Sequence, residues 1–172
     1  KNAKNILTIA NAQDATVNAT TGAITGGAAI NTSSSQGPSD DRRIKPDLTG
    51  NGTGLTSTGN GTGTGGGNTD YSSLSGTSMA APNVTGTLTL IQQHYNNENG
   101  KFMRAATLKG LATHTATDRG RPGPDAQYGW GYLDAKSCAE TITNNGLTSW
   151  ISEETLSQGQ TFTIQVMANG GA

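Results

Sequence analysis

Cysteine, apolar side chains and excess charge are all scarce in this chain of 172 residues. Its single cysteine, Cys138, excludes an internal disulfide. A net charge of −1 gives no electrostatic reason to expect nucleic acid or an anionic membrane as a partner. No apolar run approaches the roughly 20 residues that a membrane-spanning helix requires. The length would allow one domain. With 31% hydrophobic residues and 25 glycines, however, the chain has few apolar side chains to form the core of an independent fold.

What the chain does contain is a serine placed between a glycine-rich loop and a helical pattern, in the segment LSGTSMAAPNVTG at residues 74–86. Ser78 precedes apolar residues spaced by four, three and four positions, which predicts a helix that starts at the serine. The apolar residues are Val84, Leu88, Ile91 and Tyr95. The free N–H groups and the positive dipole end of this helix would face the serine and any oxyanion formed there. The segment predicts Ser78 as a nucleophile, with support from Gly76, which lacks a Cβ, and from the Thr77 hydroxyl.

A serine nucleophile needs a base, and no histidine occurs in the 77 residues before Ser78. His94 comes sixteen residues later on the same predicted helix, about 24 Å away at a rise of about 1.5 Å per residue. His114 follows a second helical pattern. We therefore expect neither histidine to act as the base.

Four motifs follow one another between about residues 5 and 142. They are INTSSSQGP at residues 30–38, RIKPDLTGNG at 43–52, GTSMAAP at 76–82 and YGWGYLDAKSCAE at 128–140. In this order they resemble motifs of the subtilisin-like serine peptidases, the subtilases. The resemblance implies an α/β, three-layer fold with a mostly parallel sheet, of which this chain would hold a part.

The same resemblance implies an enzyme that hydrolyses peptide bonds through an acyl-enzyme on Ser78, with polypeptides as substrates. It places Leu74, Ser75 and Met79 on the leaving-group side of the cleft. In subtilases the triad aspartate and histidine precede the serine in the chain. The family's oxyanion-hole asparagine also comes earlier, and Asn2 and Asn5 lack its usual context. We therefore expect a C-terminal fragment of a catalytic domain that is inert alone and needs the N-terminal half of its own domain as a partner.

The resemblance also implies an extracellular, secreted enzyme without a cofactor. Many subtilases carry structural calcium, so the resemblance leaves open whether the full-length enzyme binds a calcium ion. Asp118 and Asp125 lack the spacing of an EF-hand loop, and we expect them to be solvated turn residues. No metal ligand is assigned in this chain.

The remaining patterns predict an alternation of strands and helices. Residues 5–12 and the residues from Ile30 onward are predicted strands, residues 15–29 a hairpin or surface loop, and residues 50–68 a mobile loop. Two further helices are predicted, at residues 102–113 and at residues 135–142 after an Asp134 cap, with Cys138 buried. Tyr128 and Trp130 are expected to anchor the intervening turns against the core.

The sequence pattern changes from helical to strand-like after residues 144–148. Phe162, Ile164 and Val166 alternate with polar residues, which is the period of a strand with one buried face. We therefore assign residues 1–146 to the C-terminal portion of the catalytic domain and residues 147–172 to the beginning of a β-sandwich domain.

Two other functions compete with the peptidase. A non-catalytic subtilase relative could serve as a binding or scaffold module, and the last strand could belong to an adhesin or sugar-binding β-protein. The intact surroundings of Ser78 favour the enzyme, while the second alternative rests on one strand.

Overall fold

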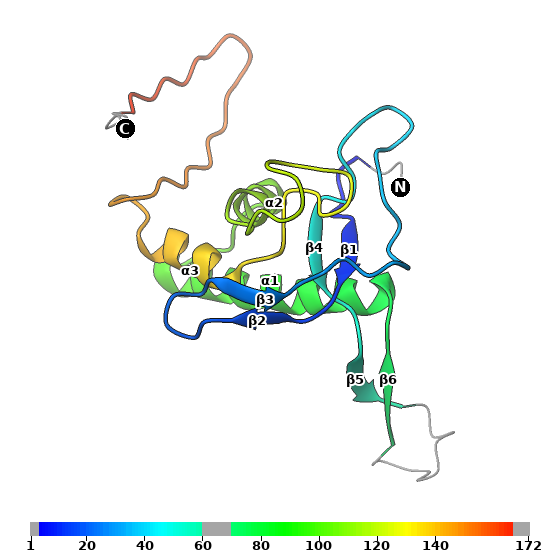
Figure 1. Ribbon diagram of the computed structural model, residues 1–172. Helices are drawn as coiled ribbons and strands as arrows, with labels where there is room; N and C mark the ends of the chain where they lie inside the picture. The colour runs from blue at the N-terminus through cyan, green and yellow to red at the C-terminus, as the bar shows by residue number, and fades with distance from the viewer. Residues whose placement is uncertain (1–3, 60–69, 167–172) are drawn as a thin grey trace.

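The computed structural model describes residues 4–59 and 70–166, in which a long helix supports a small parallel sheet (Figure 1). The parallel pair consists of β1 (Ile9–Ala12) and β4 (Leu48–Asn51), with Ile9 opposite Leu48 and Ala12 opposite Asn51. Two antiparallel hairpins flank it, formed by β2 (Ala15–Val17) with β3 (Ile24–Gly27) and by β5 (Leu55–Thr58) with β6 (Tyr71–Leu74). Parallel strands beside helices confirm the predicted α/β class.

The long helix α1 (Thr77–Asn99) packs its N-terminal half against the parallel pair. Its buried side chains follow the predicted helical spacing and are Ala80, Val84, Leu88, Ile91 and Tyr95. Gly50 of β4 makes this approach close, because a Cβ there would lie 2.5 Å from Val84 Cγ2. The helix predicted from Ser78 onward is thus confirmed.

The C-terminal half of α1 packs beneath α3 (Ala135–Thr143), with α2 (Ala105–His114) nearby (Figure 1). The apolar cluster in this region comprises Ile91, Tyr95, Met103, Leu111, Cys138 and Ile142. Burial raises the pKa of the Cys138 thiol, which agrees with the predicted role of a small buried hydrophobe. The predicted cap is also confirmed, since Asp134 Oδ1 accepts the Ser137 N–H at 2.9 Å.

The first half of the chain contains less strand than the sequence predicts. The strand expected at residues 5–12 is confined to β1, and the one expected from Ile30 is reduced to a single bridge between Ile30 and Ala12. The reason is a turn that follows at once, in which Asn31 Oδ1 accepts the Ser33 N–H at 2.9 Å. Residues 15–29 do form the predicted hairpin.

The prediction of a mobile loop at residues 50–68 is wrong for its first part. Residues 55–58 form β5, with Leu55 opposite Leu74 and Thr58 opposite Tyr71. The strand that pairs with β5 is β6, which lies beyond the glycine-rich stretch, so no local sequence pattern predicts this pairing. Residues 60–68 of the predicted loop lie outside the described residues.

Two boundary details also differ from the prediction. The helix expected at residues 102–113 begins only at Ala105, after an extended Arg104. Tyr128 is buried and its hydroxyl accepts the Ile30 N–H at 3.0 Å, but Trp130 is 48% exposed. Trp130 is held by its backbone and not by its indole, because the backbone N–H of Trp130 donates to the Asp47 carbonyl at 2.9 Å.

The chain beyond α3 runs in an extended path away from the helices (Figure 1). Ile151 still packs against the apolar cluster, and Glu153 Oε1 accepts the Arg104 N–H at 2.7 Å. The strand predicted around residues 162–166 pairs with no described strand, so the β-sandwich and the domain boundary stay predictions. Among the described residues, no helix is both long and apolar enough to cross a membrane.

Candidate active site

Ser78 is the second residue of α1 and is exposed. The first turn is closed by the Gly76 carbonyl, which accepts the N–H of Met79 at 3.0 Å and that of Ala80 at 3.1 Å. Helix geometry leaves the Ser78 N–H without an intrahelical acceptor. The hydroxyl and a free amide donor therefore stand together at the positive end of the helix dipole.

The loop before Ser78 rests on a turn at residues 51–54, directly after β4. The Gly76 N–H donates to the Gly52 carbonyl at 2.8 Å, and the Gly54 N–H donates to Ser75 Oγ at 2.9 Å. The turn is itself tied to β1, because the Gly52 N–H donates to the Ala12 carbonyl at 3.1 Å. The position of Ser78 is thus set by the parallel strands.

Gly52 is the residue of this turn that lies closest to the loop before Ser78 and to the first turn of α1. A Cβ at residue 52 would lie 2.6 Å from the Gly76 carbonyl oxygen, 2.7 Å from Asn11 Oδ1 and 2.8 Å from Ala80 Cβ. The sequence does not predict this turn, because its glycines resemble those of an unstructured loop. The structure places Gly52 directly after β4, a strand that the sequence patterns also leave unpredicted.

The other predicted site residues surround Ser78 on the same loop and helix. Leu74 ends β6 and is 54% exposed, Ser75 and Thr77 are exposed, and Met79 is half-buried. Their assignment to the substrate cleft stays a prediction. Gly76 has φ 157° and ψ 167° and joins β6 to the helix.

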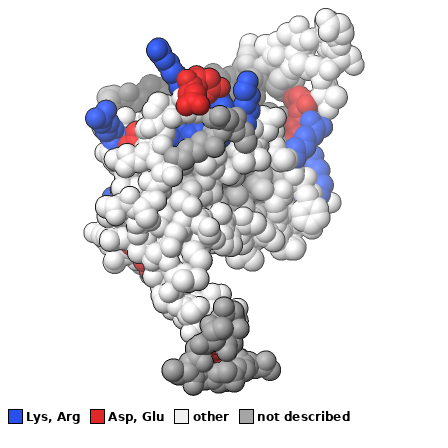
Figure 2. All heavy atoms as spheres, turned by 90° about the vertical axis from the view of Figure 1, so that its right-hand side faces the viewer, with Lys and Arg blue, Asp and Glu red and all other residues white. Residues whose placement is uncertain are grey.

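The segment that carries the serine is uncharged. No Asp, Glu, Lys or Arg occurs between Asp70 and Glu98. Figure 2 shows the charged side chains gathered toward the upper part of one face, with an uncharged middle.

Both histidines lie at the α3 end of the molecule. His94 Nε2 is 3.0 Å from Thr143 Oγ1 at the end of α3. His114 ends α2 and lines a hollow together with Thr141 and Trp150. The structure brings neither of them to the loop that carries Ser78, so the described residues offer no imidazole base there.

The buried carboxylate nearest the middle of the fold has a structural role. Asp47 Oδ2 accepts Lys45 Nζ at 2.5 Å and the Thr8 N–H at 2.7 Å. Lys109 Nζ lies 3.6 Å from Asp47 Oδ1. Two ammonium groups and an amide donor thus satisfy this carboxylate inside the protein.

The two turn aspartates bond to their own backbone. Asp118 Oδ2 accepts the Gly123 N–H at 2.8 Å, and Asp125 Oδ1 accepts the Tyr128 N–H at 2.7 Å. Burial raises the pKa of Asp125, but backbone hydrogen bonds and the Arg121 charge outweigh it and lower the pKa overall. Within residues 4–59 and 70–166, no group of three or more His, Cys, Asp or Glu is arranged to hold a metal ion.

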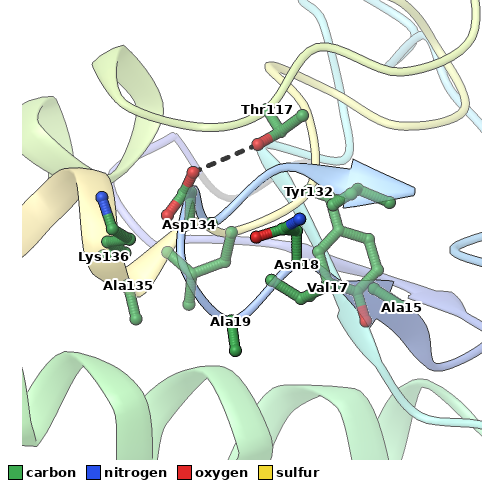
Figure 3. Close-up of a pocket in the computed structure, with 12 residues that line it drawn as sticks. Ala15, Val17, Asn18, Ala19, Thr117, Tyr132, Asp134, Ala135 and Lys136 are labelled. Carbon is green, nitrogen blue, oxygen red and sulfur yellow. Dashed lines mark hydrogen bonds between the residues drawn. The ribbon is translucent and has the colours of Figure 1, made fainter. Parts of the chain in front are cut away.

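A separate cavity of about 370 Å³ opens between the β2–β3 hairpin and the start of α3 (Figure 3). Val17 and Tyr132 contribute apolar walls, and Asp134 points to Thr117, whose hydroxyl lies 3.3 Å from Asp134 Oδ2. The residues that line this cavity include no serine, cysteine or histidine.

Comparison with known proteins points to one family. The chain is 34% identical over 91 residues to an extracellular serine protease of Serratia marcescens, which covers 53% of this chain and 8% of that protein. It is 28% identical over 130 residues to a PII-type proteinase of Lactococcus lactis subsp. cremoris, which covers 66% of this chain and 6% of the relative. The chain thus spans less than a tenth of the length of these relatives.

Solved structures agree on the fold. A lanthipeptide protease superposes with a TM-score of 0.53 and 25% identity, over 66% of this chain and 38% of that one. The CspB protease of Clostridium perfringens superposes with a TM-score of 0.58 and 24% identity, over 69% of this chain and 25% of that one. The subtilisin-like fold is thereby confirmed for this chain. The model of the subtilase family (Peptidase_S8) matches residues 1–131, and the chain therefore belongs to this family.

Proposed function

We propose that this chain is part of a secreted subtilisin-like serine endopeptidase in which Ser78 is the nucleophile. The observation that carries the proposal is the exposed Ser78 at the N-terminus of α1, on a loop fixed by the turn at residues 51–54. The name of the Serratia marcescens relative, an extracellular serine protease, supports both the reaction and the location.

In the proposed reaction, Ser78 Oγ attacks the carbonyl carbon of the scissile peptide bond. Its proton passes to a histidine and then to the leaving amine, and water later releases the acyl group by the same route. The Ser78 N–H is one donor to the oxyanion, in the field of the α1 dipole. Because the described residues place no imidazole at Ser78, we assign the histidine and its aspartate to polypeptide outside these 172 residues.

The outer side of α1 supports this division of the catalytic domain. Leu90 is 71% exposed, and the hydroxyls of Thr85 and Thr89 donate to carbonyls of their own helix at 2.9 Å. These threonines therefore present methyl groups outward, on a helix whose single charged residue is Glu98. A surface of this kind is suited to burial, and we propose that the remainder of the catalytic domain covers it.

Proteolysis by the full-length protein tests the assignment. Ser78→Ala should lower turnover on an unstructured protein substrate by a factor on the order of 10⁶. The matched control is Ser73→Ala, which removes an exposed hydroxyl in β6 and is not proposed to react or to bind substrate. Full retention of activity in Ser78→Ala would refute the nucleophile. Tight binding of polypeptides without cleavage by the wild type would favour a binding module instead.

The same proposal predicts that the 172-residue chain alone is inert. It has the serine but, in its described part, no base near it. Adding the separately expressed preceding part of the catalytic domain should restore cleavage, as measured with a quenched fluorescent peptide. Activity of the chain by itself would place the base within these residues and contradict the assignment.

A further inference from the structure

Asn11 is a fully buried polar residue in strand β1. Its backbone is satisfied, since its N–H donates to Ser34 Oγ at 3.0 Å and its carbonyl accepts the Asn31 N–H at 2.9 Å. Its side-chain Oδ1 accepts the hydroxyl of Thr53 at 3.0 Å. Its Nδ2, however, has no hydrogen-bond partner among the described residues.

An unpartnered amide donor destabilises a protein interior, and an apolar side chain in this place would avoid that cost. The side chain therefore acts through its other end, the Oδ1 atom that holds Thr53. Exchanging the two amide atoms would not remove the problem, because the oxygen would then be the group without a partner.

Thr53 connects three separate parts of the fold. Its hydroxyl donates to Asn11 Oδ1 on β1 and accepts Asn31 Nδ2 at 3.0 Å. Its backbone N–H donates to Asn51 Oδ1 at 3.2 Å, within the turn at residues 51–54. The hydroxyl thus ties this turn to two segments that lie far from it in the sequence.

The turn in question is the support of the nucleophile loop. Gly52 and Gly54, on either side of Thr53, hold the Gly76 N–H and Ser75 Oγ respectively. Asn11 Oδ1, the Gly76 carbonyl and Ala80 Cβ all lie close to the position that a Gly52 Cβ would occupy. A shift of Thr53 would therefore be passed to the loop and to the first turn of α1.

We propose that Asn11 and Thr53 form a positioning pair for Ser78, in which a buried hydrogen bond sets where the nucleophile loop lies relative to β1. This role rests on the proposed function, because it concerns the reactivity of Ser78. Asn11 is fully buried, and neither residue is proposed to contact the substrate. Their effect is on the geometry of the reacting group, and small displacements of such a group slow the chemical step more than they weaken binding.

A first measurement does not depend on catalysis. Amide hydrogen exchange at Gly54 and Gly76 in the full-length protein should be faster in Thr53→Val, which removes the hydroxyl at constant shape, and near normal in Thr53→Ser. The matched control is Thr25→Val, which removes an exposed hydroxyl that bonds the Thr16 carbonyl in the β2–β3 hairpin. Unchanged exchange at both glycines in Thr53→Val would overturn the proposed coupling.

The second measurement is steady-state kinetics on a peptide substrate. Thr53→Val and Asn11→Ala should each lower kcat about fivefold to tenfold, the size expected of one buried hydrogen bond, with KM within about twofold. Thr53→Ser should recover most of kcat. The double variant should lose little more than either single one, because both remove the same bond.

Two results would contradict the positioning role. One is a kcat equal to that of the wild type in correctly folded Thr53→Val, and the other is additive losses in the double variant. Failure of the proposed function would look different. In that case the wild-type enzyme itself would show no reaction at Ser78, whatever the exchange at Gly54 and Gly76, and the positioning role would fall with it.

Discussion

The first turn of α1, at Ser78, lies beside glycines and small polar side chains, whereas its C-terminal half lies beside large apolar ones. Near Ser78 the supporting residues are Gly52, Gly54 and Thr53, held by individual hydrogen bonds. Toward the other end, Tyr95 and Ile142 belong to one apolar cluster. The same helix is thus positioned by directional bonds at one end and by burial at the other.

This difference explains how the two ends should respond to change. Hydrogen bonds fix direction and distance, so a small loss near Ser78 should alter reactivity before it alters stability. Apolar burial is non-directional and contributes in proportion to area, so a loss near Ile142 should alter stability first. Each prediction below separates the two responses.

The largest effect is expected from Gly52→Ala in the full-length enzyme. The new Cβ would meet the Gly76 carbonyl at 2.6 Å, so the loop or the helix must move. A displacement of about 1 Å at a reacting group can reduce the rate by roughly 100-fold, and we expect at least that loss in kcat/KM. Gly54→Ala is an instructive companion, because no atom of the described residues lies within 4 Å of an added Cβ although the φ of Gly54 is 68°. It should cost stability through the backbone and leave reactivity closer to normal. Equal kcat/KM for Gly52→Ala and wild type would contradict the conclusion that the residues near Ser78 control its reactivity.

The next largest effect concerns the opposite end of α1. Ile142→Ala removes a side chain that is 2% exposed and should lower the free energy of unfolding by about 2–5 kcal/mol. The reactivity of the molecules that remain folded should be unchanged. Denaturant titration gives the first quantity and active-site labelling per folded molecule gives the second. Leu147→Ala, at a side chain that is 83% exposed, serves as the control with an expected change within about 0.5 kcal/mol.

A smaller effect tests whether the outer side of α1 is covered in the complete enzyme. Gly86 in α1 and Gly110 in α2 both have open space around an added Cβ in the described residues. Helix propensity alone would make alanine more stable than glycine at either position by about 0.5–1 kcal/mol. We expect Gly110→Ala to follow this rule in the full-length protein, and Gly86→Ala to be destabilising by about 1–3 kcal/mol through overpacking. If thermal unfolding shows that both substitutions are stabilising, the outer side of α1 is not covered in the full-length protein.

The smallest effect concerns the extended segment after α3. Hydrogen bonds from Thr107 Oγ1 and the Arg104 N–H lower the pKa of Glu153 below its ordinary value of 4.5. A carboxylate with a lowered pKa stabilises the folded arrangement above its unfolded pKa, and this contribution is lost as the pH falls through the folded value. Limited proteolysis near residues 153–155 should therefore speed up below about pH 4, while the pH 7 rate in Glu153→Gln should already be raised. Proteolysis independent of both pH and this substitution would show that Glu153 does not hold the segment.

How much of this could be predicted from the sequence depends on the range of each interaction. The spacing of Val84, Leu88 and Ile91 predicted the long helix, because a helix is built from contacts within four residues. The Asp134 cap is equally local. The motif around Ser78 predicts the nucleophile, and this assignment stays a prediction.

The parts that could not be predicted join residues far apart in the chain. The bond between Asn11 and Thr53 spans 42 positions, and β5 pairs with β6 across a glycine-rich stretch. Neither leaves a periodic pattern in the sequence. Trp130 is predicted to anchor the turns against the core, but its backbone N–H decides its place and leaves the indole 48% exposed.

The most direct test of the account is to map the adduct of a fluorophosphonate probe on the full-length protein by peptide mass spectrometry. The account predicts one labelled residue, Ser78, with labelling lost in Ser78→Ala and slowed, without being abolished, in Thr53→Val. It also predicts no labelling of the 172-residue chain alone. An adduct on another serine, or no adduct on a folded full-length protein, would contradict the central claim that Ser78 is the nucleophile.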